Sequence, residues 1–554
     1  MSFKHYKRAY FTPPTLCNEW SKKEFIDKTP LWCSVDLRDG NQALITPMSL
    51  EEKLDFFKLL VKIGFKEIEV GFPAANSAEF DFVRKLIEED LIPDDVSIQV
   101  LTQAREKIIA KTFEALKGCK NAVVHFYNST SKAQREQVFK KDKKEIKQIA
   151  LEGARLLKFF AKNTEGNFSF EYSPESFTGT ETDYALELCN EVINEFKPNK
   201  DKKLIINLPA TVELSLPHIY AQNVEYFSKN LLDRKNIIIS LHPHNDRGCA
   251  VAAAELGLLA EADRIEGTLF GNGERTGNVD LITLALNLMT HGVDSGLDFS
   301  DLPSICALYE RVSKMRVYER QPYSGKLVFA AFSGSHQDAI AKGIAYHSEN
   351  KLEIWSVPYL PINPKHIGRH YESDVIRINS QSGKGGISFV LKNALGAELP
   401  SPFKEDFSYY IKEKSVKMQK ELSSDEIVDF FKKDFLNLNE PLSLENFSFE
   451  KLKDKFKVQL EFSFENKEFK LKEFGNGRLD AVANALRSAL GLNFDIISFS
   501  EHALSSGSSS QAMAYVMIKS ADKSYYGAGL NSDIINASVL ALLSAINQYL
   551  KEKK

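Results

Sequence analysis

The chain has 554 residues, of which 43% are hydrophobic and 26% are charged, as in an ordinary globular protein with several domains. Its formal net charge of -4 and its pI near 6.3 argue against binding to nucleic acid or to a membrane surface. The six cysteines lie far apart without a C-x-x-C pair, so we expect neither a disulfide framework nor a zinc-thiolate site. No signal segment or long apolar run is present, which predicts a cytoplasmic protein.

After a proline-rich N-terminal arm (residues 1–28), short apolar runs alternate with amphipathic stretches eight times. Strands are predicted at 31–37, 67–72, 96–101, 122–127, 168–172, 204–208, 237–242 and 264–269. Helices are predicted at 50–62, 78–88, 106–116, 140–161, 181–195, 217–229, 248–260 and 278–290. Eight β-α units within about 260 residues are typical of a (β/α)8 TIM barrel, for which we assign residues 29–322. An open doubly wound sheet is the alternative, but polar residues follow many different strands rather than one switch point.

The segment SLHPHNDR places two histidines at the end of the seventh strand. Side chains two residues apart in a strand lie on one face, so His242 and His244 can bind one divalent metal ion from the same side. A carboxylate and water would have to complete the coordination shell. For an isolated H-x-H the simpler interpretation is two polar histidines in a surface turn, so the surrounding residues must decide.

In a barrel the chemistry lies in the loops after the strands, and these loops contain a coherent polar set. The candidates from the first seven strands are Asp36, Arg38, Asp39, Gly40, Asn41, Gln42, His125, Tyr127, Glu171, Glu175, Ser176, Thr211, Glu213, His242, His244, Asn245, Asp246 and Arg247. The eighth strand is followed by the glycine-rich loop 271–278, which fits neither a Walker nor a Rossmann pattern.

Several of these candidates also have structural interpretations. Asp39 could cap a turn, and Arg38 could form an ordinary ion pair at the strand end. Glu175 or Thr211 could cap the following helix, and His125 could be a hydrogen-bonded core histidine.

Beyond the barrel we expect linker subdomains over residues 323–420. They comprise a helix at 339–346 opened by His336, short strands and a helical run within 352–396, and a Lys/Glu-rich linker at 404–421. In residues 421–554 a pattern of three strands followed by a helix occurs twice. The first copy has strands at 447–449, 455–464 and 467–472 and a helix at 480–490. The second has strands at 496–505, 511–518 and 524–529 and a helix at 533–550. A duplicated βββα unit suits a dimeric ligand sensor.

The motifs DLRDGNQ, GFPAAN, EYSPESFTGTE, NLPATVE, SLHPHNDRG and GNGERTGN occur in this order, followed by SGSHQDAI, PYLPINPKHIGR and INSQSGKGG. With these motifs the chain resembles the 2-isopropylmalate synthases, in the longer form of some bacteria and of fungi. The resemblance implies a homodimeric acyltransferase that condenses acetyl-CoA with 3-methyl-2-oxobutanoate and hydrolyses the thioester. The products are 2-isopropylmalate and CoA, in the committed step of leucine biosynthesis, and leucine binding to the C-terminal domain inhibits the enzyme.

The resemblance also implies roles for individual residues. The metal ligands would be Asp39, His242, His244 and Asn278, with Asn278 opening the eighth helix and Mg²⁺ expected ahead of Mn²⁺ or Zn²⁺. Arg38 would face the carbonyl oxygen of the 2-oxo acid, Thr211 would bind its carboxylate, and Glu274 would tune the site or hold the acyl donor. The acid/base candidates that the resemblance implies are Glu175 and His336, and the position of His125 after the fourth strand makes it a third candidate. His336 is expected to act on the partner subunit's active site, or else to be a helix cap on a linker.

Three other functions remain open from the sequence. A homocitrate or citramalate synthase would use another 2-oxo acid, and a lyase would run the carbon–carbon bond formation in reverse. A non-catalytic amino-acid-binding regulator is the third, although a complete set of Asp39, His242 and His244 argues against it because a sensor needs no such metal site.

Overall fold

The computed structural model describes residues 3–331, 333–371, 384–418, 422–465, 467–504 and 510–553. The chain forms two compact units. The barrel unit consists of Met1–Val328 and Ile362–His370, and the C-terminal unit consists of Phe329–Pro361 and Tyr371–Lys554. Among the described residues, no helix has both the length and the apolar character needed to cross a membrane.

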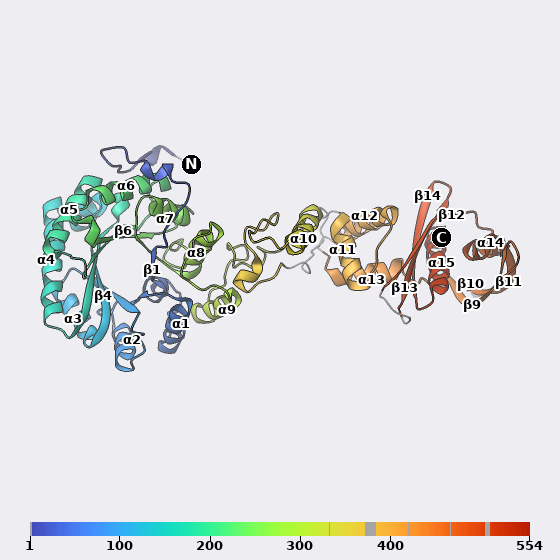
Figure 1. The fold of residues 1–554 in the computed structure, drawn as a ribbon, viewed down its shortest axis with the longest axis horizontal. Coiled ribbons are helices and arrows are strands. Elements are labelled where there is room, and N and C mark those ends of the chain that lie inside the picture. The colour runs from blue at the N-terminus through green and yellow to red at the C-terminus, as the bar shows by residue number, and fades with distance from the viewer. Residues whose placement is uncertain are drawn as a thin grey trace. The chain divides into compact units, whose positions relative to one another are not determined.

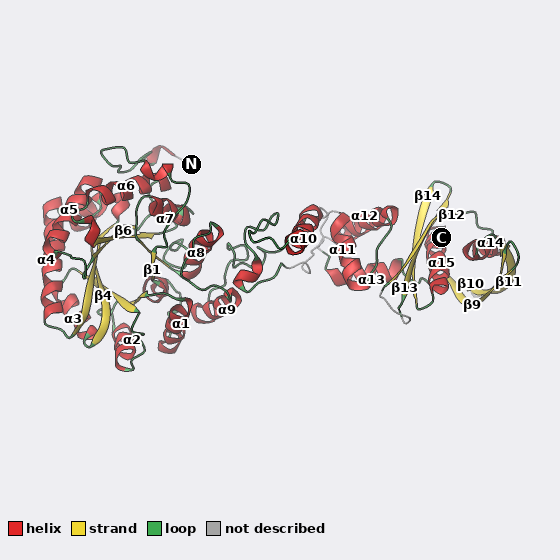
Figure 2. Ribbon diagram, viewed as in Figure 1, coloured by secondary structure: helices red, strands yellow, loops and turns green. Residues whose placement is uncertain are grey.

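The barrel unit contains a closed parallel barrel with the strand order β1 to β8, which confirms the predicted fold (Figure 1). Its strands are Leu31–Ser34, Glu67–Gly71, Ser97–Gln103, Cys119–Ser129, Gly166–Glu175, Leu204–Ala210, Ile237–Pro243 and Arg264–Gly267. The helices that follow them, α1 to α8, are Leu50–Ile63, Ser77–Glu88, Glu106–Leu116, Lys143–Lys162, Thr182–Phe196, Pro217–Asn230, Ala250–Leu259 and Leu281–Thr290. Figure 2 shows the helices as a ring around the strands.

Local signals in the sequence explain where the helices begin and end. Helix α1 starts at a capping box, in which Ser49 accepts a hydrogen bond from the backbone of Glu52 while the Glu52 side chain accepts one from the backbone of Ser49. It stops at Gly64, whose φ of 113° is readily adopted only by glycine. Asp142 begins α4 with the same reciprocal arrangement, so both helices follow their predicted positions closely.

The first strand differs from its prediction because it ends at Ser34 rather than at Leu37. The segment Asp36–Gly40 instead forms a single π-helical turn. The buried Asp36 carboxylate fixes this turn, because it accepts hydrogen bonds from the Ser34 hydroxyl (2.8 Å) and from the backbone N–H of Leu269 (3.1 Å). The turn positions Arg38 and Asp39 at the mouth of the barrel.

The interior of the barrel is polar rather than apolar. Alternate strand residues point inward, and the buried inward set is Glu69, Gln99, His125, Glu171, Ser173, Asn207, Ser240, Arg264 and Glu266. Arg264 is fully buried and binds Glu67 (Nε–Oε2 2.6 Å), Glu171 (Nη1–Oε2 3.2 Å) and Glu266. Because breaking such a network would leave a buried unpaired charge, it fixes the strand register beneath the site.

The C-terminal unit begins with helix α10 (Gly334–Glu349) and continues with α11 (Lys384–Leu395), α12 (Ser401–Met418) and α13 (Ser424–Asp434). The interpretation of 404–421 as a linker is therefore wrong where the structure describes it, since α12 covers most of it. Phe403, Phe407 and Ile411 of α12 are buried in one apolar cluster with α11, α13 and β13. The short strands expected within 352–396 are also absent from the described part of that range, which contains turns, the 3-10 helix Pro364–Ile367 and α11.

Two three-stranded antiparallel sheets follow, each with one long helix, which confirms the duplicated βββα pattern (Figure 2). The first contains β9 (Leu442–Lys451), β10 (Phe456–Phe464), β11 (Lys467–Gly475) and α14 (Arg478–Leu490). The second contains β12 (Asp495–Ala503), β13 (Ala512–Ser520), β14 (Lys523–Asn531) and α15 (Ile534–Lys553). The glycines of β14 allow close packing, because a Cβ atom on Gly529 would overlap the Ala537 carbonyl of α15. The serine-rich loop at 505–509 and most of the INSQSGKGG motif lie outside the described residues.

Candidate metal centre and active-site cavity

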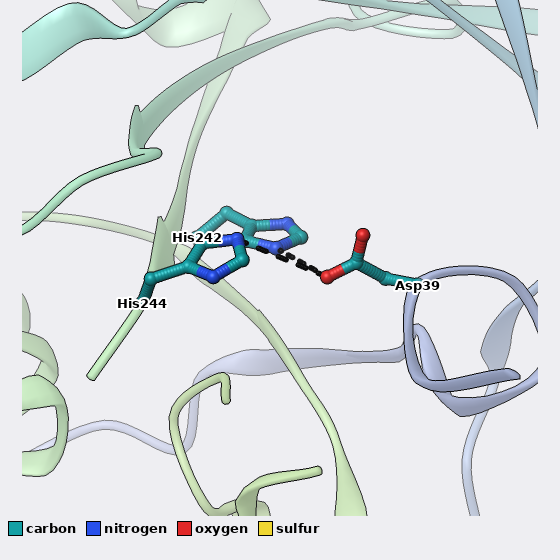
Figure 3. A group of neighbouring side chains, drawn as sticks. All are labelled: Asp39, His242 and His244. Atoms are coloured by element: carbon teal, nitrogen blue, oxygen red, sulfur yellow. Dashed lines mark ion pairs between the residues drawn. The ribbon is translucent and has the colours of Figure 1, made fainter. Parts of the chain in front are cut away.

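Asp39, His242 and His244 converge at the carboxyl end of the barrel strands (Figure 3). Oδ2 of Asp39 lies 3.7 Å from Nε2 of His242 and 3.8 Å from Nε2 of His244. The two imidazole rings are stacked, with centroids 5.4 Å apart and an interplanar angle of 20°. His242 at the end of β7 and His244 directly after that strand therefore lie on one face, as the alternation of side chains predicts, and the turn after β1 supplies the carboxylate.

Asn278 joins this group, although not from the position expected for it. Helix α8 begins at Leu281 and is capped by Asp280, so Asn278 precedes the helix instead of opening it. It forms an isolated antiparallel bridge with His244, and its backbone N–H donates to the Gly271 carbonyl (3.0 Å). The tight fold of the glycine-rich loop causes this placement, because a Cβ atom on Gly277 would overlap the Gly271 carbonyl. The Asn278 side chain still reaches the centre, with Oδ1 2.9 Å from His242 Nε2 and Nδ2 donating to Asp39 Oδ2 (2.8 Å).

The charges around the centre favour an ionised aspartate. Burial opposes ionisation, but Arg38 and the two histidines hold the pKa of Asp39 well below its usual range. Burial also disfavours a charged His242, and yet Asp39 and Glu266 raise the pKa of His242 to about 10. Burial and the neighbouring charge of His242 lower the pKa of His244 to about 4. The group thus supplies two imidazoles, a carboxylate and an amide oxygen, a donor set that fits a divalent metal ion.

Arg38 lies beside the metal centre and is held by two carboxylates. Its Nε donates to Oε2 of the fully buried Glu69 (2.6 Å), and its Nη1 donates to Asp39. These two contacts hold the Arg38 guanidinium beside the metal centre. Arg38 therefore does form ion pairs, as its structural interpretation predicted. The same side chain also lines the cavity described next.

A cavity of about 190 Å³ opens over the metal centre. It is lined by every barrel residue to which the resemblance gives a role except Asn278, together with further neighbours: Arg38, Asp39, Gln42, Leu101, His125, Tyr127, Ser173, Glu175, Asn207, Pro209, Thr211, His242, His244, Glu274 and Arg275. The carboxyl-terminal parts of β4 and β5 and the segments after β1, β6, β7 and β8 therefore bring distant sequence positions together.

Three of the predicted residues lie at the walls of this cavity. Thr211 Oγ1 accepts a hydrogen bond from the backbone N–H of Ser176 (2.9 Å), and it does not cap α6, whose N-cap is Leu216. Glu175 accepts a hydrogen bond from the Ser129 hydroxyl, and it does not cap α5. Glu274 is exposed at the rim, where Gln42 Nε2 donates to it (3.1 Å).

His125 reaches the cavity from below. It is 4% exposed, with Nδ1 3.1 Å from Glu69 Oε1 and Nε2 2.7 Å from Ser173 Oγ. Both ring nitrogens therefore have partners, as in the core-histidine interpretation.

His336 belongs to the C-terminal unit, at the start of α10. Its exposed imidazole stacks on the ring of Tyr359 with centroids 4.2 Å apart.

The sequence interpretation missed the carboxylates that support the site from below. Glu266 Oε2 lies 2.8 Å from Nδ1 of His242, and Glu69 binds both Arg38 and His125. A signal was present, since EIEVG and RIEG place charged residues inside strands of a parallel barrel, where apolar runs are usual. A charge at such an inward position marks a buried polar network.

The fold and this cluster define a (β/α)8-barrel protein that presents ligands for a divalent metal ion within a polar cavity at the carboxyl end of its strands. Comparison with known families agrees: residues 29–308 match the family described as HMGL-like, residues 326–392 match "Alpha-isopropylmalate synthase, post-catalytic domain-like", and residues 421–550 match "LeuA allosteric (dimerisation) domain".

Individual relatives extend the match over the whole chain. A 2-isopropylmalate synthase of Helicobacter hepaticus is 66% identical over 99% of this chain and 100% of its own length. One of Desulfitobacterium hafniense is 58% identical, covering 99% of this chain and 98% of the relative, and one of Clostridium acetobutylicum is 53% identical, covering 96% of each. The chain belongs to the 2-isopropylmalate synthase family.

Proposed function

We propose that this protein condenses acetyl-CoA with 3-methyl-2-oxobutanoate and hydrolyses the thioester to give 2-isopropylmalate and CoA. The observation that carries the proposal is the single cavity in which Asp39, His242 and His244 lie beside Arg38. This is the combination that an addition to a 2-oxo acid needs, because ligands for a Lewis acid stand next to a fixed cation. Family membership over the full length of the chain supports the same reaction.

Asp39, His242, His244 and Asn278 are the residues proposed to hold the ion. Mg²⁺ is the proposed ion, and the two imidazoles also suit Mn²⁺ or Zn²⁺. When bound, a divalent ion polarises the ketone of the 2-oxo acid as a Lewis acid.

The side chains around the centre have complementary proposed roles. Arg38 donates hydrogen bonds to the carbonyl oxygen of the 2-oxo acid, where negative charge develops as the new carbon–carbon bond forms. The Thr211 hydroxyl already accepts from Ser176, so its own proton is directed to another acceptor, the carboxylate of the substrate. Glu274, at the rim, is proposed to contact the acyl donor.

The acetyl methyl group must lose a proton to a base within hydrogen-bond reach. Glu175 lines the cavity and is the base that we favour within the chain. His125 is the weaker candidate, because Glu69 and Ser173 already occupy its two nitrogens. His336 is proposed to act on the active site of the partner subunit in a homodimer, where it would exchange a proton with Glu175.

Leucine is proposed to bind in the regulatory domain (residues 421–554), at a cavity of about 430 Å³ between the two βββα units. The first turns of α14 and α15 line this cavity, and helix N-termini favour a carboxylate. Asp480 and Glu501 provide negative charge for an ammonium group, while Ile535, Val539 and Phe499 provide an apolar surface for a branched side chain. Inhibition would then be a coupling free energy between this cavity and the barrel.

The testing experiment measures free CoA with a thiol reagent after acetyl-CoA is mixed with 3-methyl-2-oxobutanoate, pyruvate or 2-oxoglutarate, with and without leucine. We expect CoA release to be fastest with 3-methyl-2-oxobutanoate, to stop after chelation of divalent metal, and to slow with leucine. Preference for pyruvate or 2-oxoglutarate would instead indicate a citramalate or homocitrate synthase. Absence of CoA release with all three acids would contradict the proposal.

A further inference from the structure

A second cavity lies at the same end of the barrel and is larger than the catalytic one. Its volume is about 570 Å³, and it is enclosed by the N-terminal arm and by the loops after β6 and β7. The residues around it are Tyr6, Lys7, Arg8, Ala9, Tyr10, Thr12, Glu213, Leu214, Ser215, Leu216, His218, Ile219 and Arg247. We call it the arm cavity.

The arm cavity is the neighbour of the catalytic cavity. Thr211 lines the catalytic cavity and Glu213, two residues later in the same loop, lines the arm cavity. Asp246, which follows β7, links the loop after β6 to the loop after β8, because it accepts hydrogen bonds from the backbone N–H of Glu213 (3.0 Å) and from Arg275 Nε (2.7 Å). One loop therefore separates the two cavities.

The arm cavity carries positive charge in a chain whose net charge is negative. Lys7, Arg8 and Arg247 are exposed around it, and none of the three has an ion-pair partner among the described residues. Helix α6 points its N-terminus at the same space, and its N-cap residue Leu216 provides no side-chain cap. Unpaired cations and an uncapped helix N-terminus both favour an anionic ligand, phosphate in particular.

A further observation indicates that the ligand also carries hydrogen-bond donors. Glu213 is buried, with an exposed fraction of 6%. Its Oε2 accepts a hydrogen bond from the backbone N–H of Arg247 (2.5 Å). Its Oε1 has no hydrogen-bond partner among the described residues. A buried carboxylate oxygen without a partner is costly, and a ligand N–H or O–H at this position would satisfy it.

We propose that the arm cavity binds the nucleotide end of the acyl-CoA donor. The phosphates would lie against Arg8, Lys7 and Arg247, and a donor of the adenosine would meet Glu213. In coenzyme A a long pantetheine arm separates these phosphates from the thioester, so a nucleotide held here can present its acetyl group across the Thr211–Glu213 loop to the catalytic cavity. This assignment rests on the proposed function, because it concerns the substrate of that reaction.

The test compares acetyl-CoA with S-acetylpantetheine, which has the same thioester but no nucleotide. In Arg8→Ala and Arg247→Ala, we expect KM for acetyl-CoA to rise roughly tenfold at low ionic strength, with kcat and KM for the 2-oxo acid nearly unchanged. Activity with S-acetylpantetheine should equal that of the unaltered protein. Lys200→Ala is the matched control, because Lys200 is exposed in the loop before β6, at the opposite end of the barrel.

Two results would overturn the inference: an unchanged KM for acetyl-CoA in both variants, or an equal rise in KM for S-acetylpantetheine. Calorimetry with adenosine 3′,5′-bisphosphate separates this inference from the proposed function. If the protein binds this probe and both variants weaken the binding, the nucleotide site stands even when no CoA is released. If CoA is released normally but the probe does not bind, the site is wrong and the proposed function stands.

Discussion

Glu266 Oε2 lies 2.8 Å from Nδ1 of His242, on the opposite side of the imidazole ring from Asp39 and Asn278. A carboxylate in this position favours the tautomer that carries its proton on Nδ1, which leaves the lone pair of Nε2 for a metal ion. Arg264 in turn holds Glu266, so the orientation of a metal-facing nitrogen is fixed from the barrel interior.

The first prediction concerns this supporting carboxylate. Glu266→Gln keeps the shape but removes the charge that orients His242, so we expect metal affinity to fall about 10- to 100-fold. Glu67→Gln is the matched control, because Glu67 also binds Arg264 (2.6 Å) but does not contact His242. Metal titration by calorimetry measures both variants, and equal affinities would contradict a positioning role for Glu266.

The second prediction concerns the ligands themselves. Asp39→Ala and His242→Ala each remove a donor from the centre, so bound metal and nearly all CoA release should be lost. His291→Ala, at the far end of α8, should retain both. Elemental analysis of the purified variants measures the metal directly, and an Asp39→Ala protein with full metal content would exclude Asp39 as a ligand.

The third prediction separates the catalytic role of Arg38 from its structural role. Arg38→Ala should lower kcat on the order of 10²- to 10³-fold, as for loss of one oxyanion donor. Burial raises the pKa of Glu69, but Arg38 and His125 outweigh it and hold the pKa of Glu69 below its usual range. Removing Arg38 leaves this buried charge poorly compensated, so stability should fall by about 3 kcal/mol.

A double variant tests that distinction. Arg38→Ala with Glu69→Gln removes the uncompensated charge, so denaturant unfolding should show recovered stability while kcat stays low. If kcat recovers together with stability, Arg38 acts only through the fold.

The sequence predicted the barrel well because its signals are local. Eight apolar runs followed by amphipathic helices define the fold, and period-two alternation is enough to bring His242 and His244 together. The helix α12 was missed because its many Lys and Glu residues resemble a solvated linker, although its buried face includes Phe403 and Phe407. Composition was a poor guide there, since tertiary packing decided the structure.

The less predictable features of the site depend on loop geometry and on the closed barrel. The π-helical turn Asp36–Gly40 directs Arg38 and Asp39, and it is fixed by a hydrogen bond from Leu269, more than 200 residues away in the chain. The position of Asn278 depends likewise on a close backbone approach within the loop 271–278. Such long-range contacts leave no periodic pattern in the sequence.

The fourth prediction concerns the proposed leucine cavity. Glu501 accepts a hydrogen bond from Ser538 (3.0 Å) and faces the cavity, so Glu501→Gln should remove one charged partner of an ammonium group. Because a hydrogen bond to a charged group contributes about 1.5–3 kcal/mol, the leucine concentration for half inhibition should rise roughly 10- to 100-fold. Activity without leucine should be unchanged. Glu468→Gln, exposed on β11, is the control, and equal leucine responses in the two variants would place leucine elsewhere.

The fifth prediction tests whether His336 acts across a dimer. His242→Ala and His336→Ala should each be inactive, because one lacks a metal ligand and the other a proton-transfer group. If His336 serves the partner's active site, a heterodimer of these two variants has one intact site, and about half of the normal activity should return. Chains with two different affinity tags allow the heterodimer to be purified.

The control is a heterodimer of His242→Ala with Asp39→Ala. Both residues belong to one metal centre of one chain, so both of its sites stay damaged and no activity should return. If the His242→Ala and His336→Ala pair recovers no more than this control, His336 does not act in trans. Calorimetry of metal binding completes the comparison. The heterodimer of His242→Ala with His336→Ala keeps all metal ligands in one of its two sites, so it should bind one metal ion per dimer, whereas the control heterodimer should bind none. Recovered metal binding without recovered activity would therefore show that His336 does not complete the partner's site.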